Sequence, residues 1–109
     1  EPATGQNGTY GGYLYNDAAV RIIEEHPEPA DAGPLFIYLA TQTMHNPVQV
    51  PSYYSDMYPN GTYTEEYAVG NGMATVTDSI LGNVSAALKR RGMWAHSLVI
   101  HLSDNGGPV

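Results

Sequence analysis

The feature that most constrains the fold of this chain is a long amphipathic helix pattern between two short apolar runs. From residue 65 to residue 91, apolar side chains recur every third or fourth position, which predicts one buried helical stripe. Residues 35–40 and 97–103 are short and apolar, and runs of this length favour buried β-strands. Together they predict an α/β fold with a parallel, right-handed βαβ core.

The rest of the pattern indicates a segment of a larger domain. A second helix is predicted over residues 13–25, ended by the prolines at 27 and 29, and residues 41–64 form a long connection. Two apolar parallel strands need neighbouring strands and covering helices, and the chain offers no further convincing strand. We therefore expect residues 1–109 to be part of a domain, with a self-sufficient mini-domain as the alternative.

Charge and cysteine content exclude several function classes. Asp plus Glu outnumber Lys plus Arg by 11 to 4, which gives a formal net charge of -7. An acidic chain is not drawn by bulk charge to nucleic acid or to an anionic membrane. No apolar run approaches the roughly 18 residues of a membrane span. The chain has no cysteine, so it carries no disulfide, no thiolate metal site and no cysteine nucleophile.

Three glycosylation sequons point to a compartment. They begin at Asn7, Asn60 and Asn83, whereas the composition would give about one by chance. The sequons favour a glycoprotein of the secretory pathway, and coincidence is the alternative. Asn83 is expected on the exposed side of its helix, because Ile80 and Val84 occupy the apolar stripe.

Polar residues follow both predicted strands. In parallel α/β sheets, ligands bind beyond the carboxyl ends of the strands, so these residues are expected to share one rim. His45 follows the first strand and could hydrogen-bond to an anion or transfer a proton, although a lone histidine is more often a surface or packing residue. Asp104 and Asn105 follow the second strand and offer hard oxygen ligands for a divalent cation, or else simply form a turn.

Several short motifs in this order carry a family resemblance. They are PLFIYLATQ at 34–42, HNPVQVP at 45–51, GNVSAALK at 82–89, GMW at 92–94 and SDNGG at 103–107. Their order and spacing resemble the central segment of the type I sulfatases, with the closest likeness to arylsulfatase B and its relatives. The likeness covers nearly the whole chain.

The resemblance implies a fold, a reaction and roles for three residues. It implies an alkaline-phosphatase-like α/β fold and hydrolysis of sulfate esters on sugars or aryl groups, in lysosomes or outside cells. It further implies a formylglycine nucleophile, made from Cys or Ser in a C/S-x-P-x-R motif, and a calcium ion. By motif match, Asp104 and Asn105 resemble two calcium ligands, and His45 resembles the histidine that contacts the sulfate ester.

Departures from the family pattern leave other functions open. The chain has no Cys and no S-x-P-x-R motif, so the formylglycine is expected in the remainder of the sulfatase domain or in a complementary chain. This chain alone is expected to be inactive. One alternative is a non-catalytic, sulfatase-like glycoprotein module for binding or assembly. Another is a phosphatase or phosphodiesterase of the same superfamily, which is less favoured because those enzymes more often carry Asp-His-Gly where this chain has Asp-Asn-Gly at 104–106.

Overall fold

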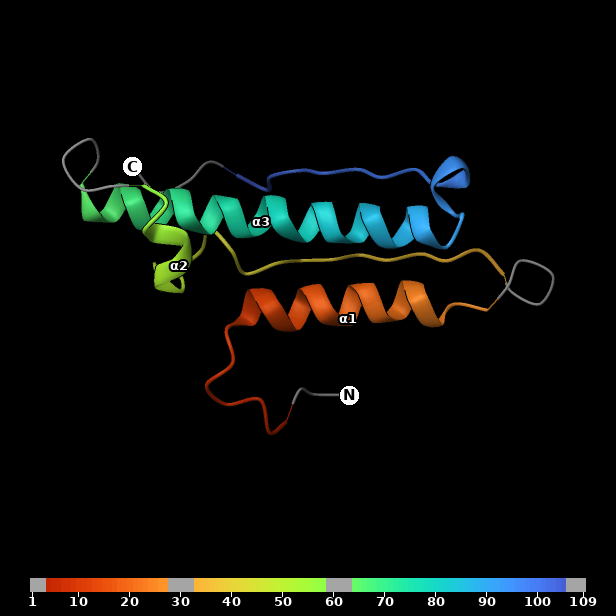
Figure 1. Ribbon diagram of the computed structural model, residues 1–109, viewed down its shortest axis with the longest axis horizontal. Helices are drawn as coiled ribbons and strands as arrows, with labels where there is room; N and C mark the ends of the chain where they lie inside the picture. Colours follow the sequence, from red (N-terminus) through yellow and green to blue (C-terminus); the bar gives the residue numbers. More distant parts are fainter. Residues whose placement is uncertain (1–3, 28–32, 59–63, 106–109) are drawn as a thin grey trace.

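The structure is a computed structural model that describes residues 4–27, 33–58 and 64–105. The elements follow in the order α1 (Gly11–Glu25), α2 (Ser52–Ser55), α3 (Glu65–Arg90) and the 3₁₀ turn η1 (Trp94–His96). α1 and α3 lie side by side and run in the same direction, with the chain returning between them in extended form (Figure 1). The radius of gyration is 16.1 Å, against about 13 Å expected for a compact domain of this length, so the molecule is elongated.

Helix α3 forms as its sequence pattern predicts. Its N-cap is Thr64, whose hydroxyl accepts from the main-chain N–H of Tyr67 at 3.4 Å. Acidic residues occupy the first turn and basic residues the last, which complements the helix dipole. Beyond the C-cap, Gly92 has a φ of 67°, a left-handed conformation that glycine adopts without strain. The buried face comprises Ala68, Gly72, Met73, Val76, Ile80, Ala87 and Leu88.

Helix α1 packs along α3 through small and branched residues. Gly12 is buried, and a methyl group in its place would lie 2.8 Å from a methyl carbon of Val76, so glycine allows the close approach. Further along, Ile23 is fully buried against Ala87 and Leu88. The helix begins two residues before the predicted start and ends at Glu25, close to the predicted proline stop.

Three polar contacts join the same two helices. The side chain of Asn83 donates to Oδ1 of Asn16 at 2.9 Å. Near the helix C-termini, Arg90 donates to Glu24, and Arg91 donates to the main-chain oxygen of His26 at 2.7 Å. In these three contacts the residue numbers increase together along α1 and α3, so the two helices run in the same direction.

The predicted βαβ core is wrong for the described residues. Residues 35–40 and 97–102 are extended, but no strand or sheet occurs within 4–27, 33–58 and 64–105. Leu35 and Ile37 pack onto the cluster around Ile23. Phe36 and Tyr38 alternate with them and are 87% and 85% exposed. The α/β expectation, a parallel βαβ piece of an alkaline-phosphatase-like fold, failed because a short, continuous apolar run reports only which side chains favour burial. It does not supply the hydrogen-bonded neighbour that defines a strand.

The second apolar run departs further from the expectation. Leu98 and Leu102 are 86% and 79% exposed, although both were expected in a strand buried on both faces. His101, which lies within this run, is also exposed. None of the described helices is both long and apolar enough to cross a bilayer.

Candidate functional site

His45 lies in the loop that follows the first extended run. Its main-chain N–H donates to the carbonyl oxygen of Gln42 at 3.4 Å, which closes a turn. Met44 within this turn has a φ of 70°, a left-handed conformation uncommon for a residue with a side chain. Strained backbone of this kind persists where the surroundings hold it and is common at functional sites. The turn leaves the His45 side chain exposed.

One hydrogen bond fixes the state of the His45 ring. Nδ1 lies 2.8 Å from the main-chain oxygen of Asn46. A carbonyl oxygen only accepts, so Nδ1 must carry the proton. In the neutral ring, Nε2 is then the unprotonated nitrogen and can accept a proton. In the charged ring, Nε2–H can donate to an anion.

His45 borders a cavity of about 220 Å³ between the loop and the start of α1. Polar groups on the cavity wall come from Thr9, Gln42, Thr43 and Gln49, and Met73 of α3 contributes an apolar part. An adjoining groove of about 410 Å³ shares Thr9, Tyr10 and Gln49 with this cavity and extends to Pro51. The cavity and the groove are neighbours, and both are lined partly by polar residues.

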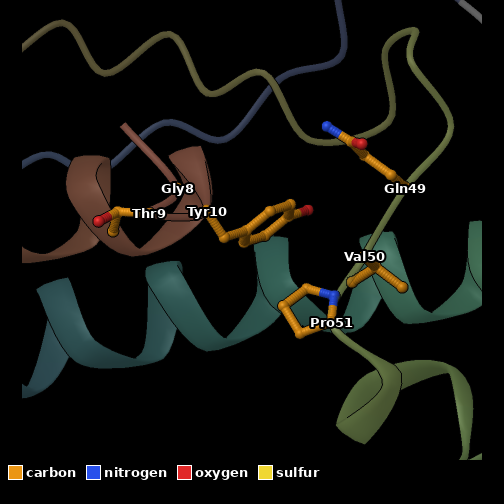
Figure 2. A pocket seen from close by; sticks show the side chains of 6 residues that line it. All are labelled: Gly8, Thr9, Tyr10, Gln49, Val50 and Pro51. Carbon is orange, nitrogen blue, oxygen red and sulfur yellow. The ribbon is translucent and has the colours of Figure 1, made fainter. Parts of the chain in front are cut away.

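Tyr10 lines both the cavity and the groove. Its side chain extends from the start of α1 toward the segment that carries Gln49, Val50 and Pro51 (Figure 2). Its ring meets the ring of Tyr13 edge-on, with 5.6 Å between the ring centroids. The ring centroids of Tyr13 and Tyr54 are 6.5 Å apart. Burial, aided by Tyr13, raises the pKa of Tyr10 above its ordinary 10.0. Tyr10 therefore presents a neutral hydroxyl near neutral pH, suited to hydrogen bonding.

Asp104 and Asn105 lie apart from the cavity lining. Both are exposed at the end of the second extended run, and the hydroxyl of Ser103 donates to the main-chain oxygen of Asn105. Neither residue lines the cavity beside His45. Across 4–27, 33–58 and 64–105, no three His, Cys, Asp or Glu side chains gather as a metal site would require. The glycines at 106 and 107 fall outside the described residues.

The donor set of Asp104 and Asn105 suits calcium but does not complete its shell. A carboxylate and a carboxamide supply hard oxygen atoms of the kind calcium prefers. Calcium takes about six to eight such ligands, so two residues account for a minor part. Asp104 and Asn105 could therefore supply two of the oxygen ligands of a calcium ion, and the other ligands would have to come from other residues.

The sequons differ in their surroundings. Asn7 is exposed in the segment before α1. Asn83 is also exposed, as predicted, and bonds to Asn16 across the two helices. Asn60 falls outside the described residues.

Most of the cavity lining was not anticipated from the sequence. Gln42 and Gln49 lie in the motifs at 34–42 and 45–51 but had no role assigned, and Tyr10 lies in none of these motifs. Only the fold brings residues 9–12 against the His45 loop. The one available signal is proximity to His45, since Gln42 and Gln49 lie within four residues of it in the chain.

Comparisons with known proteins agree on one family. The family profile described as Sulfatase matches residues 2–109. Arylsulfatase J of Mus musculus is 36% identical over 103 residues, which cover 93% of this chain and 16% of that protein. The chain therefore spans about a sixth of the length of this relative. No solved structure matched the chain.

Proposed function

Because this chain belongs to the sulfatase family, we propose that it is part of a catalytic domain that hydrolyses sulfate esters. His45 is the residue of this chain that faces the ester. The observation that carries the proposal is the free Nε2 of His45, left by the Nδ1 bond to Asn46 beside a polar cavity. The family match over nearly the whole chain supports the reaction class.

The role proposed for His45 uses the charged form of the ring, in which Nδ1–H is bonded to Asn46 and Nε2–H can donate to the ester. Hydrolysis breaks a sulfur–oxygen bond and leaves negative charge on the sulfate oxygens and on the departing alcohol oxygen. A protonated Nε2 donates to one of these oxygens, where charge builds up during the reaction. Removing one such donor typically costs about 10²- to 10³-fold in turnover. Gln42, Thr9 and Tyr10 line the same cavity and supply further hydrogen-bonding groups for the ester.

Asp104 and Asn105 are proposed as two ligands of a calcium ion. Their oxygen chemistry fits the ion, and both are exposed and available. When bound, calcium supplies positive charge that polarises and orients the sulfate group. The remaining ligands are proposed to come from other parts of the sulfatase domain or from a complementary chain.

The formylglycine nucleophile does not fit this chain. The sequence holds no cysteine and no serine in an S-x-P-x-R setting, so no residue here could become it. The formylglycine is proposed to lie in another part of the sulfatase domain or in a complementary chain.

The substrates are proposed to be sulfated sugars or aryl sulfates. The neighbouring cavity and groove offer the aromatic ring of Tyr10 together with amide and hydroxyl groups, a mixture suited to sugar and aryl surfaces. The sequons at Asn7, Asn60 and Asn83 support a glycoprotein that is secreted or lysosomal.

Activity of the complete protein that carries this chain tests the proposal. It is assayed with an aryl sulfate and with the matching aryl phosphate, with calcium and with a calcium chelator. We expect turnover of the sulfate, and a loss of about 10²-fold or more in His45→Ala. His101→Ala is the matched control, because His101 is exposed and lies outside the cavity lining.

Each alternative corresponds to a distinct result. Preference for the phosphate would identify a phosphatase of the same superfamily. No turnover of either ester by complete, correctly folded protein would leave a non-catalytic module for binding or assembly. Full activity in His45→Ala would remove His45 from the site.

A further inference from the structure

A hydrogen bond between two threonine hydroxyl groups joins the His45 loop, residues 41–50, to α3. The Oγ1 atoms of Thr43 and Thr77 lie 2.7 Å apart, which links the loop to the middle of α3. In the described parts of the chain, this is the only hydrogen bond between residues 41–50 and a helix. Thr43 lies two residues before His45 and lines the same cavity.

The hydroxyl groups of Thr77, Thr43 and Thr41 are linked by consecutive hydrogen bonds. The main-chain oxygen of Met73 accepts from Thr77 at 3.2 Å, and a carbonyl oxygen cannot donate in return. The same hydroxyl of Thr77 donates to Oγ1 of Thr43 at 2.7 Å, the shorter of its two contacts. Thr43 in turn donates to Oγ1 of Thr41 at 2.9 Å. One turn of α3 thereby fixes two threonines of the loop.

That turn of α3 also forms part of the cavity. Met73 lines the cavity beside His45, and its main-chain oxygen is the acceptor for Thr77. Met73, which lines the cavity, and Thr77, which holds the His45 loop, therefore belong to the same rigid turn of α3. A shift of the loop relative to α3 would move His45 with respect to this part of the cavity wall.

We propose that Thr77 is a positioning residue, which acts through Thr43 to hold His45 against the cavity. Thr77 does not line the cavity itself, so it acts on the loop and not on the ester. The part of this inference that concerns activity rests on the proposed sulfatase function, whereas the anchoring of the loop does not.

Helix α3 offers a matched control one half-turn away. Thr75 also donates to a main-chain oxygen of α3, that of Asn71, at 3.0 Å. Its Oγ1 lies 2.6 Å from the hydroxyl of Tyr58, which follows α2. Thr77→Val and Thr75→Val therefore remove equivalent hydroxyl groups from one helix, but only the first lies against the His45 loop.

Amide hydrogen exchange of the complete protein tests the anchoring. We expect Thr77→Val to speed exchange in residues 41–49, Thr75→Val to leave those residues unchanged, and Thr77→Ser to restore the wild-type pattern. Equal exchange in residues 41–49 in wild type and Thr77→Val would overturn the proposal. If Thr77→Val does not fold, Thr43→Val breaks the same contact from the exposed loop and must give the same result.

Kinetics distinguish positioning from a general loss of stability. We expect Thr77→Val to lower kcat/KM by about 3- to 10-fold, the size of one hydrogen bond, with Thr75→Val close to wild type. Combined with His45→Ala, Thr77→Val should cause no further loss, because its effect passes through His45. Equal losses in both valine variants, or an additive loss with His45→Ala, would overturn the proposal. A complete protein without sulfatase activity would contradict the proposed function only, since exchange still decides the anchoring.

Discussion

Arg90 donates two hydrogen bonds to one carboxylate oxygen of Glu24, from Nε at 3.0 Å and from Nη2 at 2.6 Å. The pair joins the last turns of α1 and α3, 66 residues apart in sequence. Both side chains are partly exposed, at 58% and 36%, so solvent screens the attraction.

Glu24→Gln should therefore lower the free energy of unfolding by only about 0.2–1 kcal/mol, and less at high salt. Urea unfolding at low and high ionic strength measures this. The control is Glu25→Gln, which breaks an exposed pair with Arg21 within α1 at 3.4 Å. A loss from Glu24→Gln that does not depend on salt would contradict an electrostatic role.

Two glycines one half-turn apart in α3 should respond oppositely to alanine. At Gly70 a methyl group meets nothing within 4 Å, so Gly70→Ala should stabilise by up to about 1 kcal/mol through helix propensity. At Gly72 the methyl would lie 3.0 Å from the main-chain nitrogen of Ser55, which cannot move without α2. Gly72→Ala should destabilise. Thermal unfolding of both variants checks the signs, and a gain in stability at Gly72 would disprove this packing.

Tyrosine ionisation should make the fold sensitive to alkali. Burial raises the pKa of Tyr10 and of Tyr54 above 10.0, each with a smaller contribution from Tyr13. Above pH 10 the unfolded chain loses these protons while the folded chain retains them, so the free energy of unfolding falls as pH rises. The stabilisation is fully present below pH 10. Ultraviolet titration of tyrosinate should show ionisation delayed relative to urea-unfolded protein, and Tyr10→Phe should reduce the delay.

Calcium should stabilise the complete protein through Asp104 and Asn105. At a hundredfold excess over Kd, one site contributes about 2.7 kcal/mol, which is seen as a raised Tm. Asp104→Ala should weaken that response, whereas Asp78→Ala, at another exposed aspartate, should preserve it. The same calcium response in Asp104→Ala and wild type would exclude Asp104 as a ligand.

Asn83 carries a glycosylation sequon and a hydrogen bond to Asn16, and different substitutions remove one without the other. Ser85→Ala abolishes the sequon but keeps the Asn83 bond to Asn16, whereas Asn16→Ala keeps the sequon and removes the bond. We expect a mass loss of one glycan only in Ser85→Ala, measured on protein from a secreting host. Unchanged mass in Ser85→Ala would show that Asn83 is not modified.

Helices were predictable here because their signals are local. The stripe through Met73, Val76 and Ile80 and the charges at both ends of α3 lie within one segment. Strand formation depends on a partner elsewhere, and residues 35–40 instead pack their alternate side chains on α1 and α3. His45 was proposed as a site residue because of the motif around it, and it borders a cavity in the structure. The cavity was not predicted, because Tyr10 and Met73 reach it from 35 positions before and 28 positions after along the chain.

The exposed side chains of the two extended runs have a consequence during synthesis. Phe36 and Tyr38 leave the ribosome about 60 residues ahead of Leu98, an interval of roughly 3–12 s at ordinary elongation rates. Both runs are apolar, lack proline and carry no charged side chain, which is the composition of aggregation-prone segments. The nascent chain therefore exposes one such segment before the other exists. Its yield should depend on chaperone supply and on translation speed between the two.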